Sequence, residues 1–484
     1  MKQLIFPLLA LTFAATIPAV AQGNAPTIEV RINGRPAPLH EFHQGTFALI
    51  PFEGPMDVEI RTHFNTRWVD VRPLAASIQP VIGADHETVR FHLDKPANLT
   101  VEFNRDLGKV LHLFAYAPET DAPAPGTKGV RYFGPGLHEA GVIDLTTGEV
   151  LYLAPGAWVR GCVRAVNVHD IAILGRGVLD GSGLDAARAA VPEPSATDNP
   201  AYADWNHNMI FLKNVARARL GGITLFDSRA WTVYLRECRD VTVDGMRILN
   251  PSVHYGNDGF DVVSSSRVLI QNVFVRTNDD CVVVKNLADV PMQNVVVRDS
   301  VMWNMPTGGN ALEVGFEMRG ATTSQLRFAN IDIIHVERGA AISIHQGDHG
   351  LIENVLFENI RVEDVRRKVI DFCVLYAQYG LDRAPTAEER RRNLDVGGVW
   401  DGEQRFPEAE RAARAQARGH VRNVRVKNLQ VVDGALPYSI VAGFDEEHRV
   451  DDVVIEGFSY LGRLLRSAAD ARLVVAHAHG LELR

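Results

Sequence analysis

From about residue 208 onward, short runs of apolar and β-branched residues recur, each centred on one Gly, Asn or Asp. The central residue stands at positions 222, 245, 272, 299, 330, 359, 428 and 457. Most successive copies are therefore 23–31 residues apart. A period of this size predicts a parallel β-helix, in which each repeat forms one coil. Asn tolerates the left-handed backbone of such a corner, and stacked Asn side chains can bond to one another. An ordinary sandwich with coincidental spacing is the alternative, which eight copies disfavour.

The region before the repeats has a different pattern. Residues 27–32, 57–61 and 88–93 alternate polar and apolar positions, and turn residues separate them. Period-two patterning predicts a small antiparallel β-sandwich. Residues 118–128, rich in Pro, Ala and Gly, are predicted to be a linker.

The predicted fold class is therefore all-β, a right-handed parallel β-helix preceded by a small antiparallel β-sandwich. We place the sandwich at residues 22–117 and the helix at 129–484. Two insertions are predicted within the helix, near 184–206 and 378–418; the second explains the 69-residue step between the markers at 359 and 428.

The first 21 residues have the pattern of a signal peptide. Lys2 precedes the largely apolar stretch 4–20, and Ala19-Val20-Ala21 matches an A-x-A cleavage site. A membrane anchor is the alternative, but the run is short and Pro7 and Pro18 interrupt it. We expect an exported protein, periplasmic or extracellular, without a membrane span.

The composition of the chain limits the classes of molecule that it can bind. The 484 residues carry a net charge of −9, so the electrostatic term that drives nucleic-acid binding is missing. The four cysteines lie far apart, which favours buried thiols over a disulfide framework, although export permits a bridge. No His/Cys cluster has metal-ligand spacing, and we expect neither a metal nor a cofactor. The oligomeric state stays open.

Coil stacking turns sequence spacing into site geometry. Neighbouring coils lie about 4.8 Å apart, so residues one period apart share a surface. Asp258 precedes Asp279 by 21 residues and Asp280 by 22, and the three carboxylates should therefore meet. Like charges that close push pKa values apart, as an acid/base pair requires. Solvated or calcium-binding turn acids are the alternative.

The residues around these acids resemble a known family. Residues 230–234 (AWTVY), 257–261 (NDGFD) and 278–285 (NDDCVVVK) resemble, in order and spacing, the signatures of polygalacturonases of glycoside hydrolase family 28. Residues 153–161 are similar to the first coil of such helices. The leading β-sandwich resembles the related dextranase family, family 49.

The resemblance implies a role for each acid. Asp279 would be the general acid that protonates the glycosidic oxygen. Asp258 and Asp280 would hold and deprotonate the attacking water, with inversion and no covalent intermediate. One carboxyl must be protonated and one ionised, which suits neighbours that repel each other.

Departures from the family pattern bear on the substrate. In residues 308–315 Asn310 stands where pectin-cleaving relatives have a histidine, and Glu313 adds an acid. The Arg-Ile-Lys motif that grips a uronate carboxylate is matched by residues 343–345 (SIH), so two permanent cations are lost. The substrate is therefore predicted to be a neutral polysaccharide or oligosaccharide.

Six residues are candidates for substrate binding. Four are expected to bind the hydroxyls of the substrate, unless they are surface residues without contact. Two more, just before Asp258, are expected to line the site. The first four are Asn310, Glu313, His345 and Gln346, and the other two are His254 and Tyr255.

The main hypothesis is an exported, inverting glycoside hydrolase that uses three aspartates. Its alternatives are a polygalacturonase acting on pectin and a non-catalytic carbohydrate-binding β-helix. A pectate-lyase-like eliminase is a further option. That chemistry needs calcium, a basic residue and a uronate, and the lost cations count against it.

Overall fold

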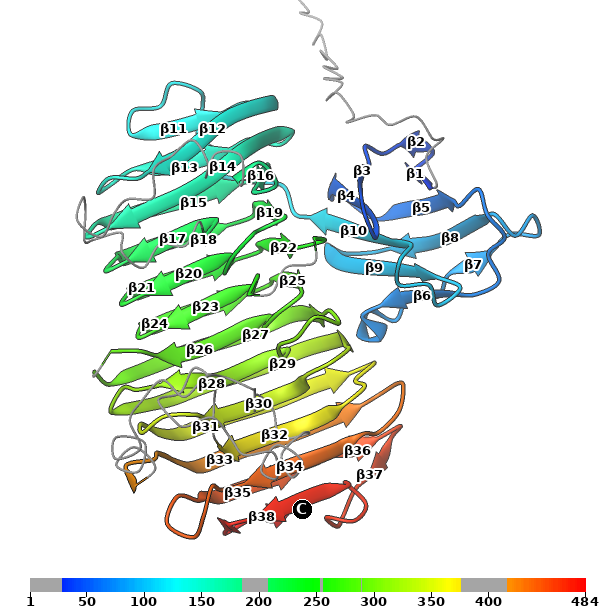
Figure 1. Cartoon of the computed structure of the whole chain (residues 1–484). Helices are drawn as coiled ribbons and strands as arrows, with labels where there is room; N and C mark the ends of the chain where they lie inside the picture. Colours follow the sequence, from blue (N-terminus) through cyan, green and yellow to red (C-terminus); the bar gives the residue numbers. More distant parts are fainter. Residues whose placement is uncertain (1–27, 185–207, 253–255, 289, 376–415) are drawn as a thin grey trace, which may run out of the picture.

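The computed structural model describes residues 28–184, 208–252, 256–288, 290–375 and 416–484. Figure 1 shows a long coiled stack of strands with a smaller β-domain against its side. The predicted signal peptide and most of both predicted insertions lie outside the described residues. No helix in the described ranges is long and apolar enough to cross a membrane.

The amino-terminal domain is a sandwich of two five-stranded sheets, as its period-two pattern indicated. Its strands pair antiparallel except β4 and β10, which run parallel. One sheet has the order β2 (Arg35–Pro36), β1 (Glu29–Ile32), β5 (Met56–Arg61), β8 (Thr88–Leu93), β7 (Val81–Ile82). The other has the order β3 (His40–Phe42), β4 (Gly45–Pro51), β10 (Val110–Tyr116), β9 (Ala97–Phe103), β6 (Val69–Arg72). A single 3₁₀ turn, η1 (Leu74–Ala76), follows β6.

The remaining strands form a parallel β-helix, which confirms the predicted fold class. Its strands stack in three columns. The site sheet contains β17 (Ile210–Lys213), β20 (Val233–Arg236), β23 (Phe260–Val263), β26 (Val282–Asn286), β28 (Leu312–Met318), β30 (Ala340–Gln346), β32 (Lys368–Val374), β34 (Tyr438–Ala442) and β38 (Leu473–Ala476). The docking sheet contains β16 (Val178–Asp180), β19 (Thr224–Phe226), β22 (Arg247–Leu249) and β25 (Phe274–Thr277). The outer sheet contains β11 (Val130–Phe133), β13 (Val150–Leu153), β15 (His169–Gly175), β18 (Ala216–Gly221), β21 (Arg239–Asp244) and β24 (Ser266–Gln271).

Longer strands bend from one column into the next, and short ones close the carboxyl-terminal end. The strands that join the outer and docking sheets are β27 (Met292–Asn304), β29 (Thr322–Val336), β31 (Leu351–Val362) and β33 (His420–Val431). At the amino-terminal end lie β12 (Gly136–Asp144) and β14 (Ala157–Val166). The last coils hold β35 (Val450–Glu456), β36 (Ser459–Tyr460), β37 (Arg463–Leu464), β39 (Ala478–His479) and β40 (Glu482–Leu483).

The marker residues of the repeat occupy one kind of corner. All eight have a positive φ, from 54° to 75°. Their side chains bond along the stack in places: Asn428 donates to Asn359 at 2.8 Å and Asn330 to Asp299 at 2.6 Å. Inside the coils, aliphatic rows and the stacked rings of Phe328 and Phe357 form one continuous core. The four cysteines are buried and free.

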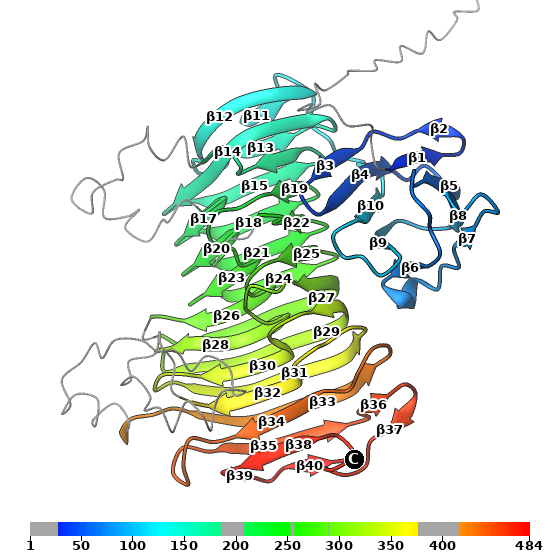
Figure 2. The same cartoon turned by 45° about the vertical axis from the view of Figure 1, so that its right-hand side comes forward.

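The sandwich packs on the docking sheet, as Figures 1 and 2 show. An apolar cluster joins Phe47 and Phe114 of the sandwich to Phe274 and Trp303 of the helix. These aromatic side chains are fully buried, although on the helix side they lie outside the coil core. Burial of such large rings stabilises the contact between the two domains.

A buried ionic network lies beside this apolar cluster. Arg72 of the sandwich donates to Glu363 of the helix at 2.7 Å and to Glu102 at 3.0 Å. His335 bonds to both Glu102 and Asp364. Because Arg72, Glu102 and His335 each have partners in both domains, the network fixes how the sandwich sits on the helix.

Candidate active site

Three carboxylates meet at the corner between the docking and site sheets. Asp258 precedes β23, while Asp279 and Asp280 link β25 to β26 on the next coil. One oxygen from each lies within 4.8 Å of the others. The Gly259 N–H donates to the Asp280 carbonyl at 2.8 Å, which holds the two coils in register here. The stacking geometry thus produces the predicted cluster.

The corner itself is rigid. Asn278 donates to the carbonyls of Asn250 and Ser252 at 2.9 and 2.8 Å. Gly309 turns with φ +69° against the acids, where an added Cβ would lie 2.3 Å from the Asp280 nitrogen. The backbone that carries the carboxylates is therefore held by neighbouring coils rather than by a free loop.

The acids differ in exposure. Asp258 and Asp280 are buried, whereas Asp279 is half-buried and accepts hydrogen bonds from the N–H groups of Gly256 and Asp280 at 3.0 and 3.1 Å. Burial raises the pKa of all three, and Asp261 and Asp279 add repulsion to the pKa of Asp258. One of the buried oxygens, Oδ1 of Asp258, has no hydrogen-bond partner.

Lys285 is the counter-charge beneath this cluster. Its Nζ lies 3.2 Å from Asp261, 3.6 Å from Asp258 and 3.8 Å from Glu317. The same ammonium lies 3.7 Å from the ring centroid of Trp231, a cation–π contact. Burial opposes the charge of Lys285, but the surrounding carboxylates raise its pKa well above the usual value. Within the described residues, Lys285 is the only cation that forms an ion pair with these acids.

Sequence reasoning had not singled out Lys285 or Asp261 as site residues. Both lie inside the motifs named above: Asp261 is the only polar residue of β23, and Lys285 follows three valines in β26. In the strand register Asp261 pairs with Val283 and Lys285 with Val263, so the two charges face the same side on adjacent coils. A negative charge in one mainly apolar strand and a positive charge in the next could have indicated this buried ion pair. Burial raises the pKa of Asp261 to about 7, against the opposing pull of Lys285.

Asn310 connects the acids to a second polar cluster. Its backbone N–H donates to Asp280 at 2.6 Å, and its side-chain amide donates to Asp280 at 3.3 Å and Glu313 at 3.0 Å. Its side-chain oxygen, Oδ1, accepts from the Ala340 N–H at 2.8 Å. Asn310 is buried and its polar atoms bond within the protein, so it orients Asp280, and the expectation that it binds sugar hydroxyls is not supported.

The expectation that Glu313, His345 and Gln346 bind sugar hydroxyls directly is not supported. All three are closed to solvent. Glu313 and His345 bond to each other at 2.9 Å, and Gln346 donates to the Gly350 carbonyl at 2.6 Å. Their side chains bond within the protein, because the parallel register of β28, β30 and β32 places them against polar residues of the adjacent coils.

His345 also differs from the mostly neutral imidazole that the sequence suggested. It lies between Glu313 and Asp371, with its Nε2 3.0 Å from Asp371. Burial disfavours its charged form, but the two carboxylates outweigh this and raise its pKa to about 10. Lys368 pairs with Asp371 as well. Both cations are thus neutralised by internal carboxylates.

His254 and Tyr255 lie outside the described residues, so their predicted places at the site stay predictions. Of the described residues, Asp258, Asp279 and Asp280 form the only group of three or more close enough to hold a metal ion. Acidic groups also commonly cluster without a metal ion.

Comparisons with known proteins agree with the motif evidence. The model of glycosyl hydrolases family 28 matches residues 155–400, about half of the chain. A probable polygalacturonase of Arabidopsis thaliana is 26% identical over 156 residues, covering 31% of this chain and 33% of the relative. The chain spans between a third and a half of the length of the first curated relatives that it matches.

Solved structures extend the likeness of the fold. Dex49A from Penicillium minioluteum matches 91% of this chain and 83% of its own, with a TM-score of 0.64 and 13% identity. A hyperthermoactive exopolygalacturonase from Thermotoga maritima matches 73% of this chain and 84% of its own, with a TM-score of 0.51 and 17% identity. The family model, which matches half of the chain, shows that this chain belongs to family 28 of the glycosyl hydrolases.

Proposed function

We propose that this protein hydrolyses glycosidic bonds by a single displacement at Asp258, Asp279 and Asp280. The observation that carries the proposal is the meeting of the three carboxylates within 4.8 Å, two buried and one half-buried. Asp279, the most exposed, acts as the acid toward the glycosidic oxygen. Its pKa is raised by burial, which favours the protonated form that an acid needs.

Water activation then falls to the two buried acids. Asp258 is held by Lys285, and Asp280 by the backbone and side chain of Asn310. Water between them loses a proton to one carboxylate as it attacks the anomeric carbon. The separation is shorter than the 6.5–9.5 Å usual for inverting enzymes, so the expectation of inversion rests on the family resemblance.

The substitution Asp279→Asn tests the role of the acid. We expect turnover to fall about 10²–10⁴-fold. Asp240→Asn is the matched control, because this exposed acid pairs with Arg267 on the outer sheet. Wild-type turnover in Asp279→Asn would refute the assignment, and no product from the wild type on any glycan would favour a carbohydrate-binding β-helix. Proton NMR of the first product identifies its anomer.

The proposed substrate is a neutral glycan. Support comes from the cations recorded near the acids in the described part of the chain: Lys285, His345 and Lys368 are each paired with carboxylates. A uronate carboxylate enclosed there would lack a counter-charge, which is costly. The alternative, pectin, is favoured by the names of several relatives, which are polygalacturonases.

A panel of dextran, galactans and polygalacturonate at matched ionic strength decides between these substrates. We expect reducing ends to be released faster from a neutral glycan. Efficient cleavage of polygalacturonate alone would reverse the assignment, and ultraviolet-absorbing unsaturated products would indicate a lyase. Export is also a proposal, and sequencing of the mature amino terminus checks it by looking for Gln22.

A further inference from the structure

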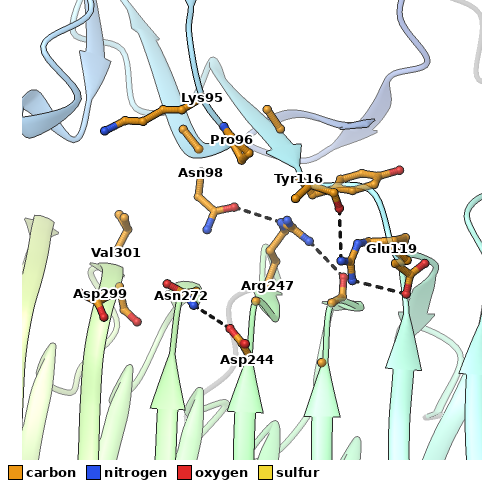
Figure 3. Close-up of a pocket in the computed structure, with 18 of the residues that line it drawn as sticks. Lys95, Pro96, Asn98, Tyr116, Glu119, Asp244, Arg247, Asn272, Asp299 and Val301 are labelled. Atoms are coloured by element: carbon orange, nitrogen blue, oxygen red, sulfur yellow. Dashed lines mark hydrogen bonds and ion pairs between the residues drawn. The ribbon is translucent and has the colours of Figure 1, made fainter. Parts of the chain in front are cut away.

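A cavity of about 920 Å³ lies between the sandwich and the helix, away from the acids. Figure 3 shows Lys95, Asn98 and Tyr116 on the sandwich side, facing Asp244 and Arg247 on the helix side. Its volume falls in the range of ligand-binding clefts, about 300–1,000 Å³. The docking-sheet strands begin at this cavity and end at the acid corner, so the two sites occupy opposite edges of one sheet.

Arg247, at the start of β22, is the unusual residue of this cavity. Arg247 is buried, with an exposed fraction of 5%. Nε donates to Asn98 at 3.1 Å and Nη1 to the Gly222 carbonyl at 3.1 Å. No carboxylate in the described ranges is recorded in an ion pair with it. Burial lowers the pKa of Arg247, and repulsion from a second cation, Arg176, lowers it further.

A second interface arginine shows what a purely structural role looks like. Arg276 is also buried without a carboxylate, but its Nε, Nη1 and Nη2 each meet a partner. Its guanidinium lies 4.3 Å from the ring centroid of Trp303, packed inside the apolar interface. Domain docking accounts for all of Arg276. Arg247 also contributes to docking, since its guanidinium lies 5.4 and 5.6 Å from the ring centroids of Phe114 and Tyr116, but it lines the cavity and its Nη2 donates to no group in the described residues.

The groups around Arg247 can bind a sugar. The amide nitrogen of Asn98 is a donor, because its oxygen already accepts from Arg247. Asp244 accepts from Asn272 at 2.7 Å through Oδ1, which leaves its Oδ2 as an acceptor. Four other acids line the cavity. Three are paired, Glu119 with Arg176, Asp299 with Arg298 and Asp332 with Arg361, and the fourth, Asp121, is exposed to solvent. The walls thus offer donors and an acceptor around one buried positive charge.

We propose that this cavity is a second, non-catalytic glycan site, which binds a sugar residue carrying a carboxylate. The carboxylate supplies the counter-charge that Arg247 lacks, through a charge-assisted hydrogen bond to Nη2. Asn98 and Asp244 bond to the ring hydroxyls.

Isothermal titration on the Asp279→Asn protein tests the proposal without cleavage. Trigalacturonate should bind at least tenfold more tightly than isomaltotriose, and added salt should weaken it. Arg247→Gln should weaken trigalacturonate binding about 10–100-fold, the range of a charged hydrogen bond. Arg276→Gln, the matched interface control, should leave binding unchanged.

Asn98→Asp keeps the shape of the cavity and gives Arg247 an internal carboxylate. It should abolish the preference for the acidic trisaccharide while the melting temperature stays equal or rises. Equal binding of the two trisaccharides by the parent protein, or unchanged trigalacturonate binding in Asn98→Asp, would overturn the proposal. Since the assay measures binding alone, its failure is distinct from failure of the proposed hydrolysis.

Discussion

Replacing Lys285 by methionine removes the counter-charge beneath the acids while keeping a side chain of similar length. Across the 3.6 Å between Nζ and Asp258, an effective permittivity of about 20 gives an attraction of roughly 4–5 kcal/mol. Without it, burial and the neighbouring carboxylates act unopposed on the pKa of Asp258. We therefore expect kcat/KM at pH 5 to fall about 10²–10³-fold, because each 1.4 kcal/mol is a factor of ten.

The direction of the pH effect separates this role from a structural one. Loss of a positive charge favours the protonated form of every nearby acid, so the pKa values of base and acid both rise. The base then needs a higher pH to ionise, and the acid keeps its proton to a higher pH. The bell-shaped profile of kcat/KM should shift to alkaline pH, with part of the activity recovered.

The assay is the pH dependence of kcat/KM on the glycan that the panel identifies. Arg236→Met is the matched control, since Arg236 occupies the same strand position as Lys285 two coils away and bonds to Tyr234 and Glu237. A Lys285→Met profile that loses height without moving along the pH axis would refute the electrostatic reasoning. So would unchanged activity at pH 5.

Three further predictions concern the domain interface and metals. Arg72→Met should lower the free energy of unfolding by about 3–5 kcal/mol in urea titrations, because it leaves Glu363 buried without its cation. The control Arg90→Met breaks an exposed ion pair with Glu59 and should lower the free energy of unfolding by less than about 1 kcal/mol. Equal effects of the two substitutions would argue against the network. Burial opposes the charge on His335, but hydrogen bonds to Asp364 and Glu102 raise its pKa, so its contribution is present at low pH and lost as pH rises. The wild type should therefore be more stable than His335→Gln at pH 5, with the gap closing at alkaline pH; a gap that widens would contradict this. Activity should survive EDTA, and loss restored by calcium would favour the lyase alternative.

The sequence repeat was the source of most correct predictions about the fold and the position of the acids. One Gly, Asn or Asp per coil marks a left-handed corner, and the spacing of Asp258 and Asp279 then fixes that their coils are adjacent. Such positions follow from a period alone. The meeting of the three acids was therefore predictable before any coordinates.

Depth within the coil was not predictable in the same way. The sequence of the strands that carry Glu313 and His345 does not tell whether these side chains face solvent or a neighbouring coil. Their burial follows from the strand register, which stacks Glu313, Ser343 and Asp371 on successive coils. Lys285 was missed for a related reason, since a lysine suggests solvent unless its strand neighbours are known. The cavity at Arg247 joins segments 149 residues apart, from domains whose docking no local pattern encodes.

The placement of the sandwich on the docking sheet has a consequence for synthesis. Phe274, Trp303 and Ile334 form an apolar face that the coil core does not use, and the sandwich covers it. A nascent chain makes the sandwich first, and domains generally fold in that order. The cover is thus in place before the strands beneath it emerge from the ribosome. Without the sandwich, each new coil would add to an exposed apolar surface, so we expect the isolated β-helix to aggregate during synthesis.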